Sequence, residues 1–105
     1  MDEVEEKMRV IVEYFSAHFP SPYTMEIVPI HRPEGSMPDD RKLRVLRDSK
    51  VAFTVIVSSA LLSDASPSAA RLAGLLQEKK IADKLKRSAE FRLNHYELGT
   101  ESPNR

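Results

Sequence analysis

The sequence predicts an α+β domain in which a three-stranded antiparallel sheet is covered on one face by an N-terminal helix and a long or broken C-terminal helix. Two observations predict this class. Apolar residues recur at helical spacing near both ends of the chain, and they alternate at strand spacing between those ends. The 105 residues suffice for one core. We therefore expect a single domain over residues 1–98 and a mobile tail over residues 99–105.

The first helix is predicted over residues 4–19, where apolar side chains recur every three to four residues. These are Val4, Met8, Ile11, Val12, Phe15 and Phe19. Asp2 is placed to act as the N-cap, and three glutamates fall in the first turn, where the positive end of the helix dipole favours anions. Pro20 ends the helix because it cannot continue the hydrogen-bond ladder.

The first strand is predicted over residues 23–30, which alternate in polarity. Pro29 cannot donate a hydrogen bond to a neighbouring strand, so this strand lies at the sheet edge or ends there. Residues 33–40 are rich in proline, glycine, serine and aspartate and predict a loop.

The second strand is predicted over residues 43–47 and the third over residues 51–57, with a tight turn at Asp48-Ser49 between them. The third strand is apolar or small on both faces, which favours a central position in the sheet. The first two strands either pair or are held apart by the loop that separates them.

Residues 68–98 favour helix, and Ser66-Pro67 resembles a helix start. A continuous helix of this span would be about 45 Å long, whereas a domain of this size has a radius of gyration of about 13 Å. Residues 77–80 lack apolar side chains. We expect a bend or break there, the alternative being a projecting helix that packs against a partner. Gly99 ends the region.

Composition excludes several classes of protein. The chain has no cysteine, so disulfides, thiolate nucleophiles, zinc fingers and iron–sulfur clusters are ruled out. Residues 1–7 are acidic where a secretory signal would be basic, and no apolar run reaches the 18 residues of a membrane span. We therefore expect a cytoplasmic protein without membrane contact.

The three histidines do not predict a metal site, because no two have the spacing that would place them on one helical face. His18 falls in the last turn of the first helix and is read as a capping residue. His31 opens the loop and could act as a base with Asp39 or Asp40, although an exposed loop histidine is favoured. His95 is expected at the surface. We predict no catalytic residue, cofactor or metal.

Charge is segregated along a chain whose formal net charge is zero. Residues 1–40 hold nine acids and three bases, a net charge of −6, and residues 41–105 carry +6. The predicted basic patch consists of Arg41, Lys42, Arg44, Arg47, Lys79, Lys80, Lys84, Lys86 and Arg87. Opposite charges either meet within one molecule or between two copies, or the basic residues bind a phosphate backbone.

The predicted function is therefore a small non-catalytic binding module for protein–protein interaction or homo-oligomerisation. The alternative is a nucleic-acid-binding accessory domain that uses basic residues within 41–50 and 71–92. Helix, three strands and helix is also the element order of double-stranded-RNA-binding domains, which contact phosphates. A small enzyme whose active site lies at an oligomer interface comes third.

Overall fold

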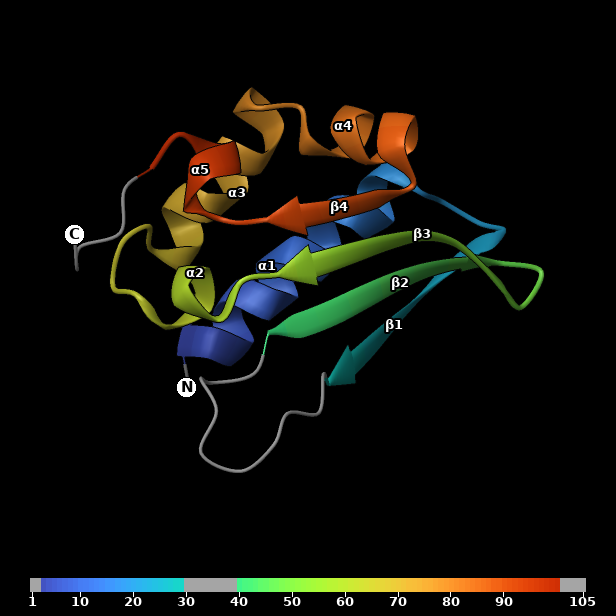
Figure 1. Cartoon of the computed structure of the whole chain (residues 1–105), viewed down its shortest axis with the longest axis horizontal. Helices are drawn as coiled ribbons and strands as arrows, with labels where there is room; N and C mark the ends of the chain where they lie inside the picture. Colours follow the sequence, from blue (N-terminus) through green and yellow to red (C-terminus); the bar gives the residue numbers. More distant parts are fainter. Residues whose placement is uncertain (1–2, 30–39, 101–105) are drawn as a thin grey trace.

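The structure is a computed structural model that describes residues 3–29 and 40–100 (Figure 1). Its elements in chain order are α1 (Glu3–His18), β1 (Tyr23–Pro29), β2 (Arg41–Arg47), β3 (Lys50–Val57), α2 (Ser59–Ser63), α3 (Ala69–Glu78), α4 (Ile81–Ser88), β4 (Glu90–Leu93) and α5 (His95–Leu98). The α+β class is confirmed. None of the helices within the described ranges is long and apolar enough to cross a membrane.

The sheet has four strands in the order β1-β2-β3-β4, so the expectation of three strands is wrong. The strands β1, β2 and β3 are antiparallel neighbours, and β4 lies parallel to β3. The missed strand, Glu90–Leu93, falls within the region that was predicted to be helical. Its four residues carry too short a pattern to compete with their helical surroundings, and pairing with β3 decides their conformation.

The break in the C-terminal helical region is confirmed. The helix α3 ends at Glu78 and α4 begins at Ile81. Between them Lys80 has a left-handed backbone with φ of 53°, so the chain turns back onto the sheet rather than projecting as one helix. A second left-handed residue, Ala89, ends α4 and leads directly into β4.

Both predicted strand positions are confirmed. The strand β1 lies at one edge of the sheet, and β3 lies between β2 and β4. Along its whole length β1 pairs with β2, from Tyr23 opposite Arg47 to Pro29 opposite Arg41. The two-residue turn between β2 and β3 has positive φ at both Asp48 and Ser49, which suits the twist of the flanking strands.

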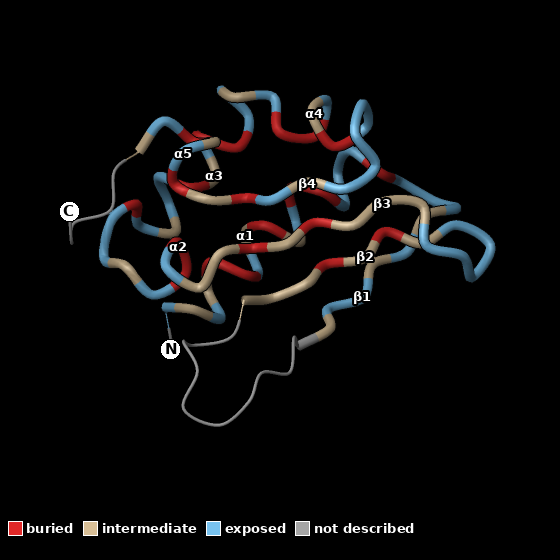
Figure 2. The backbone as a smooth tube through the Cα atoms, in the orientation of Figure 1, coloured by how far each residue is buried: buried red, intermediate tan, exposed pale blue. Residues whose placement is uncertain are grey.

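The core lies between one face of the sheet and the helices, and α1 runs behind the strands in Figure 1. From α1, Ile11 and Phe15 are fully buried, as are Leu43 and Val55 from the sheet and Leu72 from α3. Buried segments therefore line the inside of both layers, and exposed segments lie outside (Figure 2). Within residues 3–29 and 40–100, the helices pack against one face of the sheet and leave its other face uncovered (Figure 1).

Four further predictions concern the long loop and the ends of helices. The cap at Asp2 and most of the loop over 33–40 lie outside the described residues. The helix α3 begins two residues after Pro67, with the Ser68 side chain accepting a hydrogen bond from the Arg71 amide. Gly99 does end a helix, with φ of 70°, but this helix is the short α5.

Candidate functional site

One face of the sheet lies opposite the helices, and no helix of the described residues covers it (Figure 1). In β2 the buried residues alternate with half-buried ones, so Leu43 and Val45 point to the core while the side chains between them point away. Strand register extends this second set across the sheet. The open face consists of Thr24, Glu26, Val28, Lys42, Arg44, Leu46, Val51, Thr54, Ile56, Glu90 and Arg92. Every one of these eleven residues is half-buried or exposed.

The open face mixes apolar side chains with charges of both signs. One row across the strands is Glu26, Arg44, Thr54 and Glu90, and the next is Val28, Lys42, Ile56 and Arg92. In the first row Arg44 and Glu26 form an ion pair at 3.3 Å between Nη1 and Oε1. The second row places Lys42 between two aliphatic side chains. The surface therefore offers donors, acceptors and apolar area within two neighbouring rows.

Asp40 joins this face to the end of the sheet. Its Oδ1 accepts a hydrogen bond of 2.9 Å from the Ser59 amide, so it caps α2 from a residue 19 positions earlier. Its Oδ2 lies 3.7 Å from Nη1 of Arg92 on β4. The carboxylate thus links the start of β2 to α2 and to β4.

The nine residues of the predicted basic patch fall in several places. Lys42 and Arg44 lie on the open face, whereas Arg41 points to the other side and pairs with Glu5 of α1 at 3.5 Å. On the helical layer Lys84 pairs with Glu97 of α5 at 3.2 Å.

The remaining members of the predicted patch lie elsewhere. Lys79 reaches Gly99, where its Nζ is 3.3 Å from the position that a Cβ would take. Lys80 is exposed at the junction of α3 and α4. Arg47, Lys86 and Arg87 lie at the ends of β2 and α4. The acidic residues of 1–40 and the basic residues of 41–105 do form ion pairs within one molecule. These pairs are Arg41–Glu5, Arg44–Glu26 and Arg92–Asp40.

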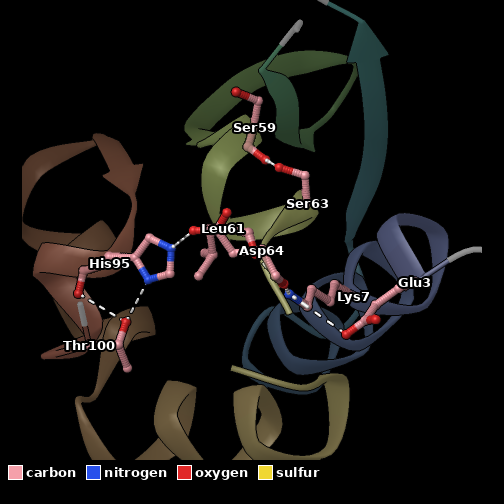
Figure 3. Close-up of polar contacts among 8 residues, drawn as sticks. All are labelled: Glu3, Lys7, Ser59, Leu61, Ser63, Asp64, His95 and Thr100. Carbon is pink, nitrogen blue, oxygen red and sulfur yellow. Dashed lines mark hydrogen bonds and ion pairs between the residues drawn. The ribbon is translucent and has the colours of Figure 1, made fainter. Parts of the chain in front are cut away.

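His95 is buried, with 9% of its surface exposed, so its predicted surface position is wrong. Its Nε2 lies 2.9 Å from Oδ2 of Asp64 and its Nδ1 lies 2.9 Å from Oγ1 of Thr100 (Figure 3). The unrecognised strand β4 explains the error, because it delivers α5 to the end of α2. The sequence did contain a signal for a separate short helix, because Asn94 is a typical N-cap residue and Gly99 a typical helix end.

Lys7 extends this polar cluster and was missed by the sequence analysis. Its side chain has no exposed surface, and its Nζ donates to the carbonyl oxygens of Leu61 at 2.9 Å and Asp64 at 2.6 Å. Glu3 lies 3.9 Å away and completes the cluster (Figure 3). Burial lowers the pKa of Lys7, and the nearby charges of Glu3 and Asp64 oppose that effect. The lysine thereby satisfies carbonyls at the end of α2.

The order carboxylate, imidazole and hydroxyl resembles a nucleophilic triad, but its contacts are those of a structural link. The side chains of Asp64 and His95 are only 10% and 11% exposed. Thr100 Oγ1 also donates to the His95 carbonyl at 3.3 Å, which ties Thr100, the second residue after α5, to the start of that helix. Thr100 belongs to the region predicted as a tail, of which residues 101–105 lie outside the description.

The remaining candidate residues are the other two histidines, His18 and His31, and Asp39 of the predicted loop. His18 is the last residue of α1, where a cation suits the dipole, and its ring lies 4.6 Å from that of Tyr14. His31 and Asp39 lie outside the described residues. Over residues 3–29 and 40–100, no three histidine or acidic side chains gather as a metal site would require.

Comparisons with models of protein families, with curated proteins and with solved structures gave no match to this chain. The functional argument therefore depends on the geometry of the open face and of the charged residues around it.

Proposed function

We propose that this protein is a non-catalytic binding module that associates with a second copy of itself through the open face of its sheet. The observation that carries the proposal is the mixture on that face of half-buried aliphatic side chains with charges of both signs. A two-fold interface brings the same patch of both copies together, so the patch must complement itself. A face that holds Glu26 and Glu90 as well as Lys42 and Arg92 meets this requirement.

The charge balance of the whole chain supports a second copy as the partner. The formal net charge is zero, so two copies approach each other without net repulsion. On the open face Lys42 lies between Val28 and Ile56 in register and forms no ion pair with another described residue. A carboxylate from a second copy is the partner that such a cation would accept.

The size of the face limits the expected affinity. The strands β1 and β2 have seven residues each, β3 has eight and β4 has four. At about 3.4 Å per residue and about 4.8 Å between strands, the sheet presents a flat area of roughly 400 Å². Stable interfaces bury about 800 Å² per partner. We therefore expect a weak association with a dissociation constant of roughly 10–100 µM, which weakens further with added salt.

Sedimentation velocity over a concentration series of about 5–500 µM tests this proposal in the range expected for so small an interface. We expect the wild-type sedimentation coefficient to rise with concentration towards that of a dimer. Thr54→Arg places a long cation in the middle of the open face and should hold the protein as a monomer. Gln77→Arg adds the same charge to the exposed side of α3 and should leave the dimer intact.

Two results would overturn the proposal. The first is a wild-type protein that stays monomeric throughout the series. The second is a dimer that Thr54→Arg and Gln77→Arg affect equally, because association would then use another surface.

A further inference from the structure

The end of the molecule formed by the β2–β3 hairpin and the C-terminus of α4 gathers cations that are far apart in sequence. These are Arg47, Lys50, Lys86 and Arg87, called here the basic end. All four are exposed. In Figure 1 the hairpin tip, the connection from α4 to β4 and the connection from α1 to β1 lie at this same end.

Three aromatic rings connect the two cationic segments. Phe19 and Tyr23 meet edge to face at 5.4 Å between centroids, and Phe53 contacts Phe19 at 5.1 Å. The guanidinium carbon of Arg47 lies 5.7 Å from the centre of the Tyr23 ring, and the Lys86 Nζ lies 5.2 Å from that of Phe19. Each cation is therefore seated on one member of a packed ring pair.

This seating orders two side chains that would otherwise be mobile. Arginine and lysine lose rotamer freedom when they bind a ligand, and side chains that are already held in place lose less. Arg47 and Lys86 are both exposed, so an anion from solution can reach their charged groups. Tyr23 and Phe53 are half-buried while Phe19 is buried, so the rings act as the support beneath the cations.

A second feature of the basic end is unfavourable in the isolated protein. Arg47 and Lys50 are register partners at the end of the β2–β3 ladder. Like charges directly opposite each other across antiparallel strands destabilise the pair. An anion bound between Arg47 and Lys50 would relieve that repulsion, so the repulsion favours the anion-bound protein over the free protein.

We propose that the basic end binds the phosphodiester backbone of a nucleic acid. The four cations are spread along two segments, the hairpin tip and the end of α4, which suits a linear polyanion better than one small phosphate. The contacts are to backbone charges, so the binding is independent of base sequence. Two exposed carboxylates, Asp48 and Glu90, lie in the same segments and limit the affinity.

Fluorescence anisotropy with labelled oligonucleotides tests the proposal at 50 mM and 200 mM salt. If four phosphates are neutralised, the logarithm of the association constant for duplex DNA falls with a slope of about −3.6 against the logarithm of salt concentration, a loss of roughly 100-fold. Duplex RNA and single-stranded DNA of equal length, measured in parallel, identify which form of backbone the site prefers.

Matched variants separate this site from a general effect of charge. The double variant Arg47→Gln/Lys86→Gln should weaken binding at 50 mM salt and reduce the slope by about 2. Arg71→Gln/Lys80→Gln removes the same charge from exposed positions at the start of α3 and at the α3–α4 junction and should change neither value. Asp48→Asn keeps a residue that tolerates the left-handed turn and should tighten binding a few-fold.

The proposal fails if none of the oligonucleotides binds at 50 mM salt. It also fails if the two double variants lose affinity equally, because the attraction would then come from overall charge. All substituted positions are exposed, and a thermal unfolding curve for each variant verifies that the fold is retained.

Discussion

Replacing Lys7 by methionine tests how the buried polar cluster holds α1 against α2. The substitution keeps an unbranched side chain that is one atom shorter, but it removes the donor that reaches the carbonyls of Leu61 and Asp64. Each carbonyl left without a partner costs about 1–3 kcal/mol, and the methionine recovers part of this because an apolar side chain has no charge to desolvate. We expect a net loss of about 2–4 kcal/mol in the free energy of unfolding.

This loss is large against the roughly 5–15 kcal/mol that stabilise a domain. At about 4–8 °C per kcal/mol for a chain of this size, the melting temperature should fall by roughly 8–32 °C. Chemical denaturation followed by circular dichroism measures the free energy directly. Lys84→Met is the matched control, because its ion pair with Glu97 is partly exposed and worth at most about 1 kcal/mol.

The pH dependence gives this prediction a second readout. Burial lowers the pKa of Lys7 below its usual 10.5. Between that lowered pKa and pH 10.5 the unfolded chain binds a proton that the folded chain has released, so the contribution of Lys7 to the free energy of unfolding rises with pH. Lys7→Met should lack this rise. A Lys7→Met protein as stable as the wild type would refute the reasoning.

Two further substitutions test contacts that position the helices. Tyr14→Phe removes the hydroxyl that accepts a hydrogen bond of 2.9 Å from the Ala82 amide at the start of α4, and we expect a loss of about 1–2 kcal/mol at neutral pH. Burial raises the pKa of Tyr14 above its usual 10.0, so the wild type should lose stability as pH rises past 10 and through the raised pKa. Urea titrations at pH 8 and above pH 10 should show a smaller decline for Tyr14→Phe, and an equal decline would contradict this origin. Asp40→Ala removes the cap of α2 and should lower the free energy of unfolding by about 1 kcal/mol. Asp40→Asn retains a hydrogen-bond acceptor and should lower it by less. Equal losses in the two variants would show that the cap is not the source of the stabilisation.

The sequence was most informative where long periodic segments dictate structure. The apolar spacing in α1, the strand alternation and the apolar gap over residues 77–80 each correspond to an observed element or break. The left-handed residue Lys80 was not apparent from composition, but the missing apolar turn beside it was sufficient to locate the break.

The features that the sequence analysis did not predict have one common cause, because each depends on contacts between distant segments of the chain. The strand β4 has four residues, and its conformation depends on β3, about 35 residues earlier in the chain. Missing β4 made α5 unpredictable, and with it the burial of His95 beside Asp64. The burial of Lys7 was likewise invisible, because a lysine in an amphipathic helix is ordinarily solvated and its partners here are backbone carbonyls.

The candidate surfaces were likewise predicted only in part, because the sequence identifies the residues but not how they are grouped in space. The nine basic residues were identified from sequence, yet which of them share a surface depends on strand register and on the turn at Lys80. Register places Lys42 and Arg44 on the open face and directs Arg41 to Glu5. Packing of Phe19 against Tyr23 brings Arg47 and Lys86 to one end of the molecule, although 38 residues separate them in sequence.

The most direct test of the proposed function is the molar mass of the wild-type protein by sedimentation equilibrium, at loading concentrations of about 10–500 µM that bracket the expected constant. The open face predicts a weight-average mass that rises from the 11.9 kDa of one chain towards twice that value. It also predicts that Thr54→Arg remains at the mass of one chain. A wild-type mass of 11.9 kDa at every concentration would contradict self-association through the open face.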